Sequence, residues 1–238
     1  YVALLTEEAA SSEKYEKRAQ EILAWVSETE GVLAGEGIKP LDGTLAGAQA
    51  AMNAFGEYRD GTKPNKVVES DATKAAVEAL NKVLAESKYN RPAYTPAESL
   101  APEAIDAAFA HLEEVEGAYF AKLSEELARQ EALTARAAQV TAAAAELEEW
   151  CQESAEDLSR EDTASTVEAA QIAADVLAAF DKDYADFAGT RVQPLKDDAA
   201  ALAADGYSEA ASVQARVDEV AAQYDALAPL RDKRAEVV

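Results

Sequence analysis

The feature that most restricts the fold is a long stretch without helix-breaking residues. No proline occurs between Pro102 and Pro194, and Gly117 is the only glycine in that stretch before Gly189. Apolar residues recur there in a near-heptad rhythm: Ile105, Phe109, Leu112, Tyr119, Leu123, Leu127, Leu133, Val140, Leu147 and Leu158. This period predicts a single helix over residues 102–158, about 85 Å long. Because compact domains rarely contain so long a helix, we expect it to connect two helical bundles.

Shorter helical segments flank the long one on both sides. The first ends where Gly35, Gly37 and Pro40 break the helical pattern. The second begins near Leu41, and a Gly-Thr-Lys-Pro sequence is expected to interrupt it with a loop near residues 61–66. No stretch has the period of two that is typical of a strand.

The C-terminal part repeats this organisation. Ser165 and Glu168 have the spacing of a capping box, Pro194 is expected to kink the helix that follows, and Ser208 begins the last helix. The sequence therefore predicts an all-α fold with two tandem three-helix coiled-coil bundles joined by a continuous long helix. We assign the bundles to residues 1–130 and 131–238.

Two tryptophans mark the internal repeat. Trp25 and Trp150 occupy similar places on the first helix of each bundle, and we expect them to pack in the core. The expected core also contains Phe109, Phe180 and Tyr224. The first core stripe is predicted to follow Tyr15, Ala19, Ile22, Trp25, Thr29 and Val32. Alanine, with 57 copies, is expected to fill much of the remaining core and let helices approach closely.

Charge and cysteine content exclude several classes of function. The formal net charge of −24 disfavours nucleic acid and anionic membranes as ligands, because both would be repelled. Residues 1–130 contribute −10 (13 basic, 23 acidic) and residues 131–238 contribute −14 (9 basic, 23 acidic). The single cysteine and the absence of an apolar span or leader favour a reducing cytoplasm.

The sequence offers little material for catalysis or metal binding. His111 and Cys151 are the only residues of their types, so we predict no enzyme, no cofactor and no metal site, and keep an enzyme built on carboxylates as a minor alternative. The acidic run 181–186 lacks the glycine of a calcium loop. Glu113, Glu114 and Glu116 are interpreted as a solvated helix face, with a docking surface for a basic partner as the alternative.

Several local sequences resemble a known family. Ile22-Leu23-Ala24-Trp25-Val26, Phe55-Gly56-Glu57-Tyr58-Arg59, Lys63-Pro64-Asn65-Lys66-Val67 and Asn90-Arg91-Pro92-Ala93-Tyr94 are similar to the first repeat of the α-actinin rod. The second half resembles a spectrin repeat mainly through Trp150, Phe180 and the ending at Tyr224. Tyr224 and Phe109 stand where many such repeats have tryptophan.

The resemblance implies the rod of an actin cross-linker. It implies an antiparallel homodimer in the cytoplasm and cytoskeleton, which would bind F-actin through flanking domains absent from this sequence. A monomeric spectrin-repeat scaffold for other proteins is the alternative. The expected loop around Lys63, Pro64 and Lys66 is the candidate for a partner contact, against a purely structural kink.

Overall fold

Most of the residues that the structure describes are helical. The computed structural model describes residues 1–89, 91–160 and 166–237, and it contains no strand within those ranges. The chain divides into two compact units: unit 1 is Tyr1–Asp42 with Ala46–Leu127, and unit 2 is Gly43–Leu45 with Ala128–Val238. The boundary lies at Leu127/Ala128, where the sequence suggested 130/131.

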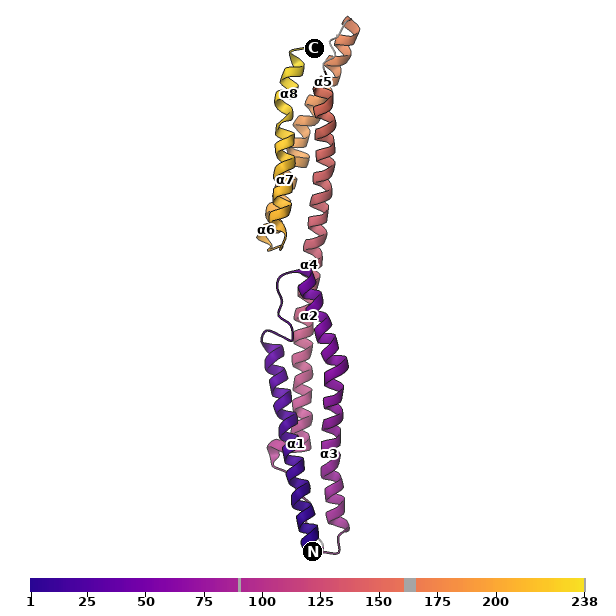
Figure 1. The fold of residues 1–238 in the computed structure, drawn as a ribbon, viewed down its shortest axis with the longest axis vertical. Coiled ribbons are helices and arrows are strands. Elements are labelled where there is room, and N and C mark those ends of the chain that lie inside the picture. The colour runs from indigo at the N-terminus through magenta and orange to yellow at the C-terminus, as the bar shows by residue number, and fades with distance from the viewer. Residues whose placement is uncertain (90, 161–165, 238) are drawn as a thin grey trace. The chain divides into compact units, whose positions relative to one another are not determined.

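Unit 1 is a three-helix bundle (Figure 1). Its elements are α1 (Val2–Ala34), α2 (Leu45–Glu57), a π-helical turn η1 (Tyr58–Thr62), α3 (Lys63–Glu86), a 3₁₀ turn η2 (Glu98–Leu100) and the first part of α4 (Pro102–Leu158). Its core combines side chains from all three layers: Val26, Leu33, Ala51, Phe55, Tyr58, Leu112, Tyr119 and Leu123. A second cluster joins Tyr15, Ala19, Ile22, Val77 and Ile105. Both clusters confirm that the apolar faces of the helices point inward.

Unit 2 repeats the arrangement. It contains the rest of α4, α5 (Val167–Phe187), a second π-helical turn η3 (Ala188–Val192), α6 (Gln193–Ala204), α7 (Ala210–Asp225) and α8 (Leu227–Ala235). Its core stretches along α4, α6, α7 and α8, and α5 adds only partly buried side chains such as Leu177, Phe180 and Phe187. The helix α5 is therefore the least buried long helix of this unit among the described residues.

The long helix α4 begins and ends where the sequence predicted. It runs from Pro102 to Leu158, and its two ends belong to different units. Pro102 suits a first helical position, because a proline there loses no hydrogen bond that the helix would otherwise make. Fully buried alanines such as Ala144, together with Ala19, Ala51 and Ala199 on other helices, confirm that alanine fills part of the core.

The predicted loop near residues 61–66 is wrong. The chain stays helical there and widens into the π-helical turn η1, in which the Lys63 N–H donates to the carbonyl of Tyr58, five residues earlier. A second π-helical turn, η3, precedes Pro194, and in it the Gln193 N–H donates to the carbonyl of Ala188. A proline ring collides with the carbonyl four residues before it in an α-helix, and a wider turn relieves that collision. Both prolines then lie in the first turn of the helix that follows.

One position of a predicted core stripe changes, and one predicted cap lies partly outside the described residues. The core stripe of α1 passes from Ile22 to Val26 and Leu33, whereas Val32 is exposed. The predicted capping box includes Ser165, which lies outside the described residues, as does Asn90 of the sequence that resembles the α-actinin rod. In the described part, Thr166 is the N-cap of α5, and its hydroxyl accepts a hydrogen bond from the N–H of Ala169.

Candidate functional site

Each unit contains an aromatic cluster around its tryptophan. In unit 1 the ring centroid of Trp25 lies 6.5 Å from that of Tyr58 and 6.2 Å from that of Phe109. Trp25 and Phe109 are half-buried, and both pack against the core. The cluster links α1 to the π-helical turn η1 and to α4.

Unit 2 has the corresponding cluster around Trp150. Its ring lies 5.8 Å from Phe180, 4.8 Å from Phe187 and 6.2 Å from Tyr224, measured between centroids. Tyr224 is buried and its hydroxyl donates a hydrogen bond to the carbonyl of Tyr184 in α5, four residues before η3. Burial raises the pKa of Tyr224 to about 12. The structure thus brings Trp150, Phe180 and Tyr224 together, with two of the three only half-buried.

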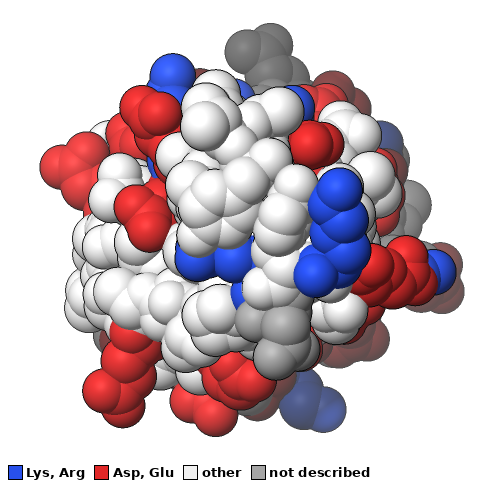
Figure 2. Space-filling view, turned by 90° about the horizontal axis from the view of Figure 1, so that it is seen from below, with Lys and Arg blue, Asp and Glu red and all other residues white. Residues whose placement is uncertain are grey.

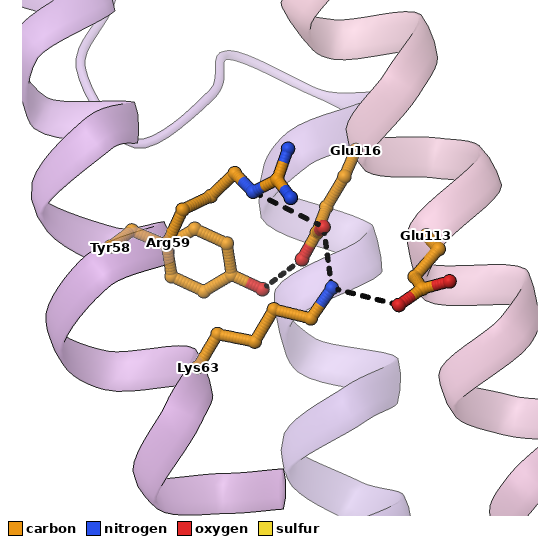
Figure 3. Close-up of polar contacts among 5 residues, drawn as sticks. All are labelled: Tyr58, Arg59, Lys63, Glu113 and Glu116. Atoms are coloured by element: carbon orange, nitrogen blue, oxygen red, sulfur yellow. Dashed lines mark hydrogen bonds and ion pairs between the residues drawn. The ribbon is translucent and has the colours of Figure 1, made fainter.

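A buried polar cluster joins η1 to α4 in unit 1 (Figure 3). Glu116 on α4 is 2% exposed and accepts two hydrogen bonds of 2.7 Å, one from the Tyr58 hydroxyl to Oε1 and one from the Lys63 ammonium to Oε2. The Lys63 Nζ also lies 3.5 Å from Glu113 Oε1, and the Arg59 Nε lies 4.0 Å from Glu116 Oε2. Both carboxylate oxygens therefore bind donors from the π-helical turn and the residue that follows it.

In this cluster the Tyr58 phenol lies beside the ion pair of Glu116 and Lys63. Burial and the hydrogen bond to Glu116 raise the pKa of Tyr58 well above its usual value of 10.0. A buried charge of this kind is tolerated only when an opposite charge and hydrogen bonds compensate it. Lys63 and Tyr58 provide that compensation, so the cluster holds η1 in one position against α4.

The three candidate partner-contact residues differ in their exposure to solvent. Lys63, expected in an exposed loop, is only 8% exposed because its ammonium is paired with Glu116. Pro64 is exposed, and Lys66 is partly buried, with its Nζ 2.7 Å from Glu69 Oε2 and 6.0 Å from the centre of the Trp25 ring. The structure therefore leaves Pro64 alone of the three fully accessible.

The interpretation of Glu116 as part of a solvated face is wrong. Glu113 and Glu114 are exposed, but Glu116 follows Leu112 by four residues and precedes Tyr119 by three, which places it on the buried face. This spacing of the Glu116 carboxylate from the apolar residues of the helix could have indicated from the sequence that Glu116 is buried. Its partner Lys63 is 53 residues away, and no local pattern connects the two.

Unit 2 has a different ion pair at the corresponding level. Glu116 lies seven residues after Phe109, and Arg231 lies seven residues after Tyr224, the residue that contacts Trp150 as Phe109 contacts Trp25. The Arg231 guanidinium makes two hydrogen bonds to Asp181, of 2.7 and 2.6 Å, and holds the pKa of Asp181 below its usual value. Asp181 belongs to the acidic run 181–186 of α5, and its carboxylate is paired with Arg231 of α8.

Cys151 and His111 are the remaining residues considered for catalysis or metal binding. Cys151 is buried, and burial raises the pKa of its thiol to about 11, which disfavours the reactive thiolate. His111 is exposed, with its Nδ1 2.7 Å from Glu30 Oε1. Within the described ranges, no three His, Cys, Asp or Glu side chains lie close enough to hold a metal ion. No helix in those ranges is long and apolar enough to cross a membrane.

Comparison with known proteins relates the second half of the chain to a family. The spectrin repeat family model matches residues 135–236. This half of the chain is therefore similar to a spectrin repeat. This match lies in unit 2, where Trp150, Phe180 and Tyr224 form the aromatic cluster.

Longer proteins with related sequences extend this relationship over the first half. The chain is 31% identical to human spectrin beta chain, non-erythrocytic 4, over 92% of its own length and 8% of that protein. It is 30% identical to α-actinin of Dermatophagoides farinae and 31% identical to human α-actinin-1, each over 95% of this chain and 25% of the relative. The chain thus spans a quarter or less of these relatives, and the matches confirm its resemblance to the spectrin repeats of the α-actinin rod.

Proposed function

We propose that this spectrin-repeat chain is a structural rod of an actin cross-linking protein. In this proposal it pairs antiparallel with a second copy and sets the spacing of actin-binding ends that belong to other parts of the protein. The observation that supports it most is the match to α-actinins over 95% of the chain. The role is mechanical, which agrees with structural pairing of the buried ionisable groups Glu116 and Lys63.

The helices supply the stiffness that such a role needs. Residues on both sides of the boundary at Leu127/Ala128 belong to the same helix α4. Bending a helix sharply requires breaking backbone hydrogen bonds or inserting a kink-forming residue, and α4 has no proline after its first position. Force applied along the chain is therefore transmitted through hydrogen-bonded backbone. A cytoplasmic, cytoskeletal location belongs to the same proposal.

A monomeric scaffold for other proteins is the second candidate. The charge of the chain favours it, because two copies with a formal net charge of −24 repel each other. Acidic side chains also outnumber basic ones in the view of Figure 2. The two candidates differ in whether the chain pairs with itself.

Sedimentation equilibrium over a wide range of protein concentration distinguishes them. The rod proposal predicts that the mass rises with concentration from 25.3 kDa toward twice that value and then stops. A mass that stays at one chain up to the highest concentration would overturn the rod proposal and leave the scaffold. A mass that keeps rising beyond two chains would contradict a closed two-fold dimer.

A further inference from the structure

The helix α5 is attached to unit 2 through its C-terminal half, residues 180–187. The Arg231 guanidinium of α8 donates two hydrogen bonds to the Asp181 carboxylate, and the Tyr224 hydroxyl of α7 donates one to the Tyr184 carbonyl. The two phenylalanines of this half belong to the aromatic cluster of unit 2. Ring contacts and hydrogen bonds therefore join this half of α5 to α4, α7 and α8.

The N-terminal half of α5, residues 167–179, has weaker contacts. Among the described residues, the hydrogen bonds that involve its side chains or its N-cap stay local: the Ala169 N–H donates to the Thr166 hydroxyl, and Gln171 donates to Asp175. Its partly buried residues are Ala169, Ala170, Ala173 and Leu177. Three of these four are alanines, which bury little apolar surface and therefore stabilise the packed position of the helix only slightly.

A groove of about 660 Å³ lies along this half. Leu158 of α4 and Ala169 and Ala173 of α5 contribute to its walls. Ile172 and Val176 also line it, yet they are 65% and 60% exposed. Space that no side chain fills removes the dispersion contacts that close packing of two helices supplies. The N-terminal half of α5 is therefore packed loosely against its unit.

The corresponding helix of unit 1 is packed more tightly. Like α5, α2 precedes a π-helical turn and a proline, so the two helices occupy the same place in their units. Gly47, Ala48, Ala51 and Phe55 of α2 are buried, whereas no residue of α5 is buried, and the structure describes all of α5. Loose packing is thus a particular feature of α5 and not a consequence of the three-helix arrangement.

We propose that the N-terminal half of α5 opens from unit 2 in a separate step, because the groove leaves it loosely packed, and that the hinge lies at Phe180. The C-terminal half and the other helices of the unit stay in place during this step. Proteins open locally where few buried apolar contacts oppose the motion. The opened state uncovers Leu158 and lets this end of unit 2 yield without unfolding the rest. The opening is a property of one chain and does not depend on whether two copies pair.

Hydrogen exchange of the full chain, followed by mass spectrometry, tests the opening. After correction for intrinsic rates, we expect the amides of residues 171–179, which lie past the first turn, to exchange at least about tenfold faster than those of residues 181–187 and of α7. Equal exchange in the two halves of α5 would overturn the hinge. Exchange of residues 171–179 as slow as that of α7 would overturn the opening itself.

Filling the groove tests its role in the opening. Ala173→Leu adds an apolar side chain to the wall of the groove and is expected to slow exchange of residues 171–179 about threefold or more, because the closed state then buries more apolar surface. Ala174→Leu is the matched control, since Ala174 is exposed and does not line the groove. It is expected not to slow exchange. Equal effects of the two variants, or no slowing by Ala173→Leu, would overturn loose packing as the cause.

Weakening the attachment of the C-terminal half tests the hinge independently. Tyr224→Phe removes the hydrogen bond to the Tyr184 carbonyl without changing the sequence of α5. The thiol of Cys151 is buried in the same core cluster and does not line the groove, so its labelling by a thiol reagent reports larger openings. We expect Tyr224→Phe to speed this labelling about fivefold and to leave exchange of residues 171–179 unchanged.

A second tyrosine supplies the control for this variant. Among the described residues the Tyr207 hydroxyl makes no hydrogen bond, so Tyr207→Phe removes the same atom without affecting α5 and is expected to change neither rate. Exchange of α7 verifies that each variant is folded. If Tyr224→Phe speeds exchange of residues 171–179 as much as it speeds the labelling of Cys151, α5 opens as one piece and the proposed hinge is wrong.

Discussion

At the scale of single residues, Glu116 determines how the second helix of unit 1 meets α4. Its carboxylate is buried, accepts hydrogen bonds from Tyr58 and Lys63, and lies among apolar neighbours on the core face. Such a cluster stabilises one arrangement, because any other leaves a charge buried without a partner. The net contribution of the cluster to the free energy of unfolding is smaller than the loss caused by removing one partner, because both charges lost their hydration on folding.

Breaking this cluster from one side is expected to destabilise unit 1 strongly. Glu116→Leu leaves the Lys63 ammonium and the Tyr58 hydroxyl buried without their acceptor and is expected to cost about 3–5 kcal/mol of unfolding free energy. Urea unfolding followed by circular dichroism measures the change. Glu116→Leu combined with Lys63→Met and Tyr58→Phe is expected to recover most of that loss.

The exposed pair Lys66–Glu69 supplies the control for this prediction. Its Nζ–Oε2 distance is 2.7 Å, the same as for Lys63 and Glu116, but the Glu69 side chain is 55% exposed. Glu69→Gln is expected to change the unfolding free energy by less than about 1 kcal/mol. A loss as large as that from Glu116→Leu would show that burial is not the cause.

His111 offers a direct measurement of one surface ion pair. The hydrogen bond from His111 to Glu30 raises the pKa of the imidazole above its ordinary value of 6.5. Because the folded pKa lies above the unfolded one, the pair stabilises the fold at low pH, and this contribution is lost as pH rises through the folded pKa. We expect an NMR titration of this sole histidine to give a midpoint above 6.5.

Replacing the acidic partner tests the assigned cause. With Glu30→Gln the midpoint is expected to fall back toward the ordinary value, and the unfolding free energy loses the part of its pH dependence that His111 supplies. A wild-type midpoint at or below 6.5, or one that ignores the substitution, contradicts the Glu30 pairing.

At the scale of elements, the two π-helical turns explain how a helix continues past a proline. η1 precedes Pro64 and η3 precedes Pro194, and each is closed by a hydrogen bond from the residue just before the proline to a carbonyl five residues back. Polar groups from the third helix bind at the first turn and close to the second: Glu116 binds Tyr58 and Lys63, and Tyr224 binds the carbonyl of Tyr184, which lies in α5 four residues before η3. The turns are thus packed features of both units.

The position of a proline in a helix is therefore expected to affect the stability of the fold more than the number of prolines does. Pro64→Ala should change the unfolding free energy of the chain by no more than about 1 kcal/mol, because Pro64 already lies in the first turn of α3 and breaks no further hydrogen bond. Ala75→Pro, at an exposed site in the middle of α3, should cost about 3 kcal/mol or more. Thermal unfolding of both variants compares them directly. Equal losses would mean that η1 does not accommodate the proline.

At the scale of the whole molecule, charge is the main opponent of self-association. Each copy has a formal net charge of −24, and the two predicted bundles contribute −10 and −14. Any contact between two copies must therefore form against this repulsion. Salt reduces that repulsion over distances of about 8–10 Å at physiological ionic strength.

The dimer is consequently expected to tighten as salt is added. Raising NaCl from about 0.03 M to about 0.3 M should lower the dissociation constant, because the Debye length falls and the acidic chains repel less. Light scattering at fixed protein concentrations measures this. The more negative Lys17→Glu, Lys122→Glu variant should show a steeper dependence, and a dimer that weakens with salt would show that local ion pairs outweigh the repulsion.

The sequence by itself determined the helical content, the repeat and the limits of the long helix. Apolar residues every three to four positions and the missing prolines suffice for that, since they act within a few turns, and α4 runs from Pro102 to Leu158 as predicted. The resemblance to α-actinin likewise rested on local motifs.

Only the tertiary structure decided what happens at the proline sites and which charges are buried. The chain near residues 61–66 stays helical, with the π-helical turn Tyr58–Thr62 followed directly by α3. Glu116, 53 residues after Lys63, pairs with the Lys63 ammonium, so Lys63 is buried and the predicted partner loop does not form. Side chains so far apart in the sequence become neighbours only when the bundle folds. The apolar period of one helix does not predict which residues of another helix will contact it.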